Sequence, residues 1–187
     1  MTDIRIETER LLIRRFQPSD GVDFAEILTD PEVCFFEPYD VFTYDAAVAE
    51  AAVLAADESF YAVILKSSGK LIGKLYFKNM NFFDTYEVGY TFNRHFWGMG
   101  YATEATHAIV HHAFTEIGVR RLYAEADIQN VRSCRILEKI GMRREGVHLK
   151  SAAFQTTADG ELIWSDYCSY AMLCEEYIQK NGGSQSI

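Results

Sequence analysis

The sequence lacks any long apolar run. No stretch approaches the roughly 20 consecutive apolar residues of a membrane-spanning helix, and residues 1–7 do not have the apolar core and basic flank of an export signal. The cysteines are neither in CxxC pairs nor dense enough for a disulfide scaffold; they are Cys34, Cys134, Cys168 and Cys174. We therefore expect a soluble, cytoplasmic protein with reduced thiols, no membrane partner and no metal.

Positive charge is scarce. The chain has 18 Lys and Arg against 27 Asp and Glu, which gives a formal net charge of −9 at pH 7. Binding to a phosphate backbone needs Lys and Arg to displace counterions, so this balance argues against a nucleic-acid partner.

The few basic residues are also unevenly distributed. Between Phe16 and Leu65 there is no Lys or Arg, whereas residues 130–144 hold five basic residues and one acidic residue, a local charge of +4. The five are Arg132, Arg135, Lys139, Arg143 and Arg144. This asymmetry predicts one surface that attracts cations and another that attracts anions, unless both regions are only solvated surface.

Length and composition fit one ordinary domain, since 187 residues of which 49% are hydrophobic can bury a sizeable core. No internal repeat or linker interrupts the chain. We assign residues 1–180 to a single domain and expect residues 181–187 to form a frayed tail.

Hydrophobic periodicity and turn residues predict alternating strands and helices. Strands are expected at 4–16, 60–66, 71–79, 86–93 and 122–127, around Val147 and at 164–173; helices are expected after Pro18 and at 43–56, 100–117 and 130–140. A four-residue repeat, Ala105, Ile109, Ala113 and Ile117, marks the buried stripe of the longest helix. The order predicts an α/β (α+β) fold with a mixed, mostly antiparallel sheet of six to seven strands and helices on both faces.

A Gly-x-Gly turn between a strand and this long helix is the most informative motif. Gly98 and Gly100 let the backbone approach a ligand, and the free N–H groups and dipole of the helix start favour an anion such as pyrophosphate. The dinucleotide pattern G-x-G-x-x-G is absent, because its last position is Thr103, which argues against a nicotinamide cofactor.

The turn resembles the pyrophosphate loop of the GCN5-related N-acetyltransferases (GNAT), which reads Arg or Gln, two residues, Gly, one residue, and Gly or Ala. Here it runs from His95 to Gly100, with His95 at the place of Arg or Gln. Longer strings resemble the RimJ/RimL-like ribosomal-protein N-terminal acetyltransferases. They are ETERLLIRRF at 7–16, WGMGYATEA at 97–105, and Asn130, Ser133, Leu137, Glu138, Lys139, Ile140, Gly141 and Met142. The strings occur in the family's order over most of the chain.

The resemblance implies a sheet whose central strand pair is splayed, and acetyl-CoA as the acetyl donor. Tyr90, Thr91 and Phe92 would run along the pantetheine arm. His95 and the residues Trp97, Gly98, Met99, Gly100, Tyr101, Ala102 and Thr103 would wrap the pyrophosphate. Asn130 and Ser133 would face the pantetheine and sulfur, with Arg135 and Lys139 near the nucleotide phosphates. Asn130 could instead serve only as a helix cap.

The resemblance also implies acetyl transfer to a primary amine. An amine with a pKa of ~10.4 is almost wholly protonated at neutral pH, so a base must take a proton before attack. Glu87 is the candidate base, directly or through water, although it could be an ordinary strand residue. Ser133 is the candidate proton donor to the leaving thiolate, because Leu137 stands where many relatives have Tyr. Glu104, at the helix start, is interpreted as structural.

The expected acceptor is the N-terminal α-amine of a protein or peptide, which attacks directly in a ternary complex. A small basic amine (a polyamine, an aminoglycoside or an amino-acid-like molecule) is the alternative, and a non-catalytic acyl-CoA-binding module is a third. An aromatic cluster in the acidic part of the chain could be core or could line the acceptor site; it comprises Phe35, Phe36, Tyr39, Phe42 and Tyr44. A homodimer is compatible with the sequence.

Overall fold

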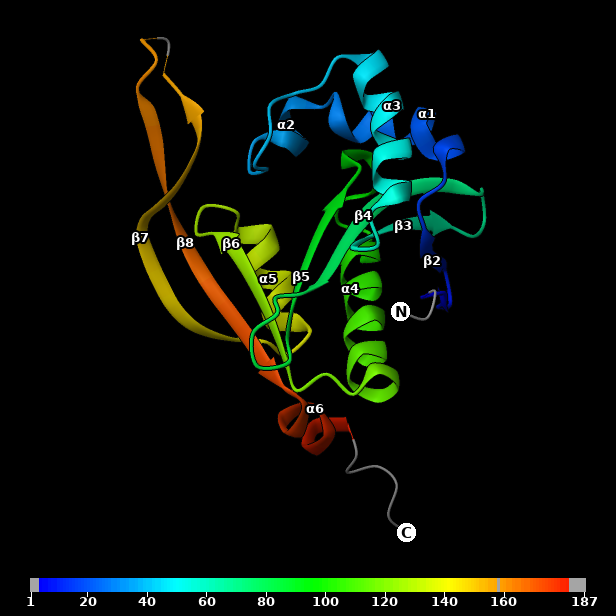
Figure 1. Cartoon of the computed structure of the whole chain (residues 1–187), viewed down its shortest axis with the longest axis vertical. Coiled ribbons are helices and arrows are strands. Elements are labelled where there is room, and N and C mark those ends of the chain that lie inside the picture. The colour runs from blue at the N-terminus through cyan, green and yellow to red at the C-terminus, as the bar shows by residue number, and fades with distance from the viewer. Residues whose placement is uncertain (1–3, 158, 182–187) are drawn as a thin grey trace.

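A computed structural model describes residues 4–157 and 159–181 (Figure 1). They form one sheet with the strand order β1-β2-β3-β4-β5-β6-β8-β7. The strands are β1 (Ile6–Glu7), β2 (Leu11–Arg15), β3 (Phe60–Leu65), β4 (Lys70–Asn79), β5 (Thr85–Phe92), β6 (Arg121–Asp127), β7 (Arg143–Thr156) and β8 (Leu162–Leu173). The α-helices are α1 (Gly21–Leu28), α2 (Pro31–Cys34), α3 (Tyr44–Ala56), α4 (Tyr101–His112), α5 (Val131–Lys139) and α6 (Cys174–Asn181). Short helical turns lie at Pro18–Asp20, Arg94–Phe96 and Ala113–Ile117.

The predicted fold class is confirmed, but the sheet has eight strands instead of six to seven. The first predicted strand, 4–16, is divided by a turn in which Thr8 N–H donates to the Leu11 carbonyl at 2.9 Å. This turn pairs Glu7 with Leu12 and creates a hairpin of β1 and β2. Loose apolar alternation does not reveal such a turn, because the two arms carry similar residues.

The centre of the sheet is splayed. Every neighbouring pair is antiparallel except β5 and β6, which pair in parallel only through residues 85–87 and 121–123. Beyond Glu87 the two strands diverge, as their upper ends show in Figure 1. The backbone edge of β5 that faces β6 is therefore without a ladder partner over residues 88–92.

Helices cover both faces of the sheet. The face under α4 and α5 buries one apolar cluster, which includes Ala105, Ile109 and Leu137, and the face under α1 and α3 buries another around Phe24 and Leu71. The predicted stripe of the longest helix is buried at three of its four positions, but Ile117 is 39% exposed. From residue 113 the helix continues as a π turn, which has more residues per turn, so Ile117, four positions after Ala113, no longer faces the core.

The C-terminal part departs furthest from prediction. The sequence analysis did not predict α6, which packs Tyr177 into the core against Phe114. Asn181 is the last residue of this helix, so the tail was predicted to begin one residue too early; residues 182–187 lie outside the described part of the chain. Within the described ranges, no helix is both long and apolar enough to cross a membrane.

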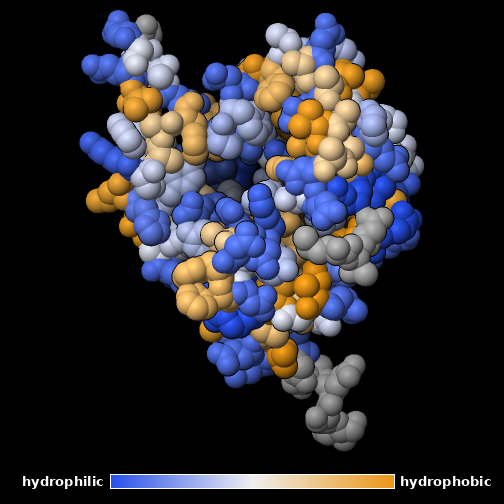
Figure 2. All heavy atoms as spheres, in the orientation of Figure 1, coloured by the Kyte–Doolittle hydropathy of each residue, from blue (hydrophilic) through white to orange (hydrophobic). Residues whose placement is uncertain are grey.

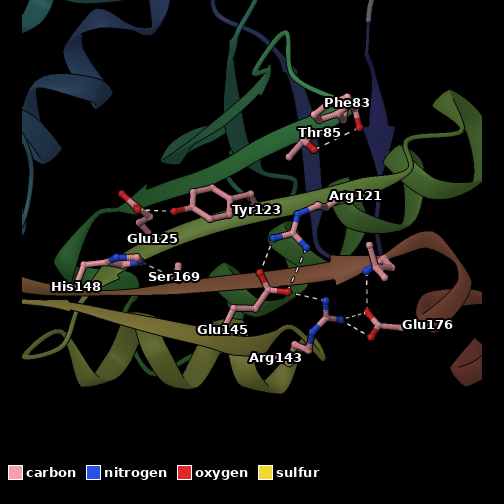
Figure 3. A network of polar contacts seen from close by, with 11 residues as sticks. Phe83, Thr85, Arg121, Tyr123, Glu125, Arg143, Glu145, His148, Ser169 and Glu176 are labelled. Carbon is pink, nitrogen blue, oxygen red and sulfur yellow. Dashed lines mark hydrogen bonds and ion pairs between the residues drawn. The ribbon is translucent and has the colours of Figure 1, made fainter. Parts of the chain in front are cut away.

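A series of ion pairs connects β6, β7 and α6 (Figure 3). Arg121 of β6 contacts Glu145 of β7 at 2.5 Å, and Glu145 also contacts Arg143 at 2.6 Å. Arg143 in turn pairs with Glu176 of α6. Arg143 thus helps to hold β7 and α6 in place.

Candidate active site

A cavity of about 500 Å3 opens where β5 and β6 diverge. Residues of α5 and of α3 both line it, so it connects the two faces of the sheet. The segment 36–39 and the β7–β8 hairpin, through Phe154 and Tyr167, border it as well. In Figure 2 the surface is hollowed between this hairpin and the helical part of the molecule.

The turn between β5 and α4 leaves backbone N–H groups free at the start of the helix. Gly98 and Gly100 have φ angles of 76° and 84°, in the left-handed region that glycine adopts without strain. No side chain caps α4 at Gly100, and the first N–H groups of a helix have no partner within it. A Cβ at position 98 would meet no atom within 4 Å, so the turn is open to a ligand. This geometry can hold an anion.

The turn is held from the α1 side by Asn93 and Arg94. Asn93 is buried; its Oδ1 accepts from the His95 N–H at 3.0 Å, and its Nδ2 donates to Glu26 at 2.9 Å. Arg94 forms an ion pair with Asp30 at 2.8 Å. His95 itself is exposed at the start of the turn, next to these anchors.

Glu104 secures the other side of the turn. Its carboxylate accepts from Thr8 Oγ1 at 2.6 Å and from Arg10 Nε at 2.6 Å. Burial alone would raise the pKa of Glu104, but the hydrogen bonds from Thr8 and Arg10 outweigh it and hold the pKa below its ordinary value. Arg10 also donates to the Met99 carbonyl at 3.0 Å and lies 4.3 Å from the Tyr101 ring centre. These contacts give Glu104 a structural role.

Three further residues of the predicted loop, Ala102, Thr103 and Trp97, either belong to helix α4 or pack against the core. Ala102 and Thr103 lie in the first turn of α4, where their backbone N–H groups face the start of the helix. Trp97 Nε1 donates to the Phe92 carbonyl at 2.8 Å. Phe92 is buried in the core under α4, so only its backbone is available to a ligand.

Helix α5 brings Asn130 and Ser133 to the cavity. Asn130 Oδ1 accepts from the Ser133 N–H at 3.1 Å, so Asn130 caps the helix, the simpler of its two predicted roles. Leu137 is buried, with 1% exposure, and also borders the cavity. No hydroxyl is therefore available where many relatives have Tyr.

Arg132 of α5 lies against Trp97 of the glycine turn. The guanidinium carbon of Arg132 is 4.6 Å from the centre of the Trp97 ring. Arg135 and Lys139 are exposed, and across residues 4–157 and 159–181 neither forms an ion pair. Their charges remain available to phosphates.

The side chain of Tyr90 lines the cavity. Its OH donates to the Ser133 carbonyl at 3.0 Å and lies 3.1 Å from Ser133 Oγ, so it crosses from β5 to α5. Burial raises the pKa of Tyr90 above its ordinary value, and the phenol stays protonated at neutral pH. The resemblance places Tyr90 only beside the pantetheine arm; its position on the strand before the turn is the feature of the sequence that indicates a further role.

Glu87 lies where β5 and β6 begin to diverge and lines the cavity. Burial raises its pKa, the negative charge of Glu125 raises it further, and Lys78 opposes both. A carboxylate with a raised pKa is a stronger base toward an ammonium group. The structure therefore brings Glu87, Tyr90 and Ser133 to one cavity.

The opposite side of the cavity is aromatic and acidic. Phe36, Tyr39 and Phe42 of the predicted aromatic cluster line it, whereas Phe35 and Tyr44 are 53% and 57% exposed. Gln155 Nε2 of β7 donates to the Phe35 carbonyl at 2.8 Å and joins the hairpin to the segment after α2. The cavity thus has an enclosed side suited to a second substrate.

Comparison with known proteins identifies the family. Residues 10–143 match the family model described as Acetyltransferase (GNAT) domain. The uncharacterized N-acetyltransferase YnaD of Bacillus subtilis is 36% identical over 175 residues, which cover 93% of this chain and 99% of YnaD. The chain belongs to the GNAT acetyltransferase family. It is an acyl-CoA-dependent acetyltransferase.

Solved structures of GNAT proteins share this fold. An acetyltransferase (GNAT family) from Bacillus anthracis superposes with a TM-score of 0.84 at 34% identity, covering 92% of this chain and 100% of that chain. The ribosomal-protein-S5-alanine acetyltransferase from Vibrio fischeri superposes with a TM-score of 0.74 at 20% identity, covering 94% and 99%. At that identity the second likeness concerns the fold alone.

The residues present fit acetyl-CoA, the donor that the GNAT fold implies. The open turn at Gly98 and the uncapped start of α4 suit its pyrophosphate, and the unpaired edge of β5 suits an extended pantetheine chain. Arg135 and Lys139 suit its remaining phosphates. Bound there, acetyl-CoA would supply an acetyl group activated as a thioester.

Sequence reasoning missed Glu37, Lys74 and Asn93. Glu37 and Lys74 line the cavity from the segment after α2 and from β4, and Asn93 holds the turn. Glu37 and Lys74 are remote from the glycine motif in sequence, and tertiary contacts bring both next to Thr91 of β5: Thr91 Oγ1 donates to Glu37, and Lys74 is opposite Thr91 in the β4–β5 ladder. Asn93, directly before the turn, could have been found as the N-cap of Arg94–Phe96.

Proposed function

We propose that this GNAT enzyme transfers the acetyl group to the N-terminal α-amine of a peptide or protein, by direct attack in a ternary complex. The observation that carries the proposal is the cavity that joins the donor side at Ser133 to the acidic, aromatic side near Glu87. An α-amine has an ordinary pKa of about 7.7–8.0, so a partly buried carboxylate suffices to deprotonate it.

Glu87 is the proposed base. Its carboxylate takes a proton from the incoming ammonium group, directly or through a water molecule, and passes it to solvent. The raised pKa of Glu87 supports this role, because proton transfer is most effective when the pKa of the base approaches the working pH.

Backbone N–H groups on the unpaired part of β5, residues 88–92, are the proposed donors to the developing negative charge on the carbonyl oxygen. Tyr90 and Ser133 are together proposed to supply the proton that the leaving thiolate needs. The Tyr90 hydroxyl, which donates to the Ser133 carbonyl and lies 3.1 Å from Ser133 Oγ, would give its proton to the departing thiolate and then recover one from solvent, and Ser133 orients that hydroxyl. This assignment changes the expectation that Ser133 acts alone.

A small basic amine is the second candidate acceptor. The carboxylates that line the cavity favour it, because they would attract any cation of suitable size. All four cysteines are free thiols, which supports action in a reducing compartment such as the cytoplasm.

Release of CoA thiol tests the function. Acetyl-CoA is offered with N-terminal peptides, polyamines, aminoglycosides and amino acids, to the wild type and to Glu87→Gln. Turnover on α-amines that falls at least about a hundredfold in the variant is expected. Turnover confined to polyamines or aminoglycosides would move the enzyme to the second candidate. Tight acetyl-CoA binding without turnover on any amine would indicate a binding module.

A further inference from the structure

Lys74 is the one lysine or arginine among the described residues that line the cavity. It lies on β4 with an exposure of only 8%. Its ammonium donates to the Tyr39 hydroxyl at 3.3 Å and lies 5.0 Å and 5.7 Å from the ring centres of Tyr39 and Phe60. A buried lysine therefore borders the cavity.

Lys74 has no ion-pair partner within 4.0 Å in the described part of the chain, and a carboxylate bound beside it would favour its charged form. Burial lowers the pKa of Lys74, while the charges of Glu37 and Glu50 oppose that effect from farther away. One oxygen of Glu37 already accepts from Thr91 Oγ1 at 2.9 Å. An ammonium group has three donors, and burial is costly when they lack acceptors. Lys74 is thus prepared for an anionic group that enters the cavity.

The rest of the cavity has the opposite charge. The carboxylates that line it are Glu37, Glu50, Glu87, Glu125 and Asp127. A simple anion would be repelled by this set, whereas a molecule that carries both an ammonium and a carboxylate group can place each near its opposite charge.

We propose that the acceptor is such a zwitterion, with its amine toward Glu87 and its carboxylate bound by Lys74. In the β4–β5 ladder Lys74 is opposite Thr91, and Glu87 is opposite Lys78 on the same face. Four residues of strand correspond to roughly 13 Å, a span that the Lys and Glu side chains shorten from both ends. A molecule whose carboxylate is a few bonds from its amine fits the remaining distance between the Lys74 and Glu87 side chains. This inference rests on the proposed function.

Two sources supply that chemistry: a free amino acid, or a peptide whose first residue is Asp or Glu. The experiment compares acceptors that differ only in charge. Free amino acids are paired with their α-amides, and peptides beginning with Asp or Glu are paired with peptides beginning with Asn or Gln. The kcat/KM ratio within each pair is measured with acetyl-CoA at saturation. A preference of at least about tenfold for the carboxylate is expected in one of the two series, which identifies the source.

Lys74→Met keeps the length of the side chain and removes its charge. In this variant the preference should fall to near one, through a higher KM for the carboxylate acceptor. Lys66→Met, an exposed lysine of the β3–β4 turn, is the matched control and should retain the full preference.

Turnover that does not distinguish carboxylate from amide in the wild type overturns the inference and leaves the acetyltransferase function intact; this comparison needs no variant. A preference that survives Lys74→Met in folded protein also overturns it. Absence of turnover on every acceptor, with acetyl-CoA bound, overturns the proposed function itself.

Discussion

At the scale of single residues, the reacting groups come from places that are far apart in sequence. Leu137 is apolar where many relatives have a hydroxyl, and Tyr90 of β5 reaches Ser133 of α5 from the other wall of the slot. In the proposed reaction the proton donor is therefore Tyr90 on the strand instead of a residue of the helix. This exchange gives a direct test.

Tyr90→Phe should lower kcat by at least about tenfold with little change in the KM for acetyl-CoA, because it removes a hydroxyl and keeps the ring in place. Steady-state kinetics with a saturating amine measures both constants. Ser133→Ala, which leaves the Tyr90 hydroxyl its contact with the backbone carbonyl, should have a smaller effect. If Ser133→Ala is the more severe change in kcat, Ser133 is the donor and Tyr90 only supports it.

The pH dependence of kcat should report Glu87. As a base it must be ionised, so activity rises as the pH increases through a pKa that lies above the ordinary value of 4.5. Glu125→Gln removes a negative charge that raises this pKa, and should therefore move the acid limb to lower pH. Glu87→Gln should abolish the limb. A limb that stays in place in Glu125→Gln would assign it to another group.

At the scale of elements, the turn between β5 and α4 combines two left-handed glycines with an uncapped helix start. Gly98 has φ of 76° and open space around its Cα, and Gly69 in the β3–β4 turn has φ of 71° and the same open surroundings. The two positions share a left-handed backbone conformation that would strain any residue other than glycine, and they differ in whether a ligand is expected there.

Gly98→Ala and Gly69→Ala should each lower the free energy of unfolding by about 1–2 kcal/mol, the cost of a left-handed conformation for an L-residue. Only Gly98→Ala should also weaken acetyl-CoA binding, because the new methyl group occupies the approach to the turn. Thermal unfolding and titration calorimetry measure the two effects. Equal acetyl-CoA affinity in both variants would remove Gly98 from the binding site.

At the scale of the whole molecule, the β7–β8 hairpin leaves the body of the protein as an arm with apolar side chains in solvent (Figures 1 and 2). Leu149, Leu162 and Trp164 are 76%, 54% and 51% exposed. β7 is also the last strand of the sheet, so its outer edge is unpaired. Exposed apolar groups on an open strand edge favour association with another chain.

We expect the arm to support a homodimer. Sedimentation velocity over about a hundredfold range of concentration should show a dimer that Leu149→Glu weakens. Val53→Glu is the control, since Val53 is 58% exposed on α3 and away from the arm. A wild type that sediments as a monomer throughout would contradict the expectation.

The sequence by itself determined the features that depend on neighbouring residues. The caps at Thr43 and Asn130, the left-handed glycines and the order of most strands and helices could be predicted, because each depends on residues a few positions apart. The turn at Thr8, the widening of the helix at 113 and helix α6 were missed, since their local patterns are weak or interrupted.

Only the tertiary structure decided which side chains share the cavity. Tyr90 and Ser133 are 43 residues apart, and Glu37 and Thr91 are 54 residues apart, yet each pair is joined by a hydrogen bond. The Lys74 ammonium contacts Tyr39 in the segment after α2, which lies 35 positions away in sequence. Strand order, register and the divergence of β5 from β6 set these distances, and they arise from packing across the whole sheet.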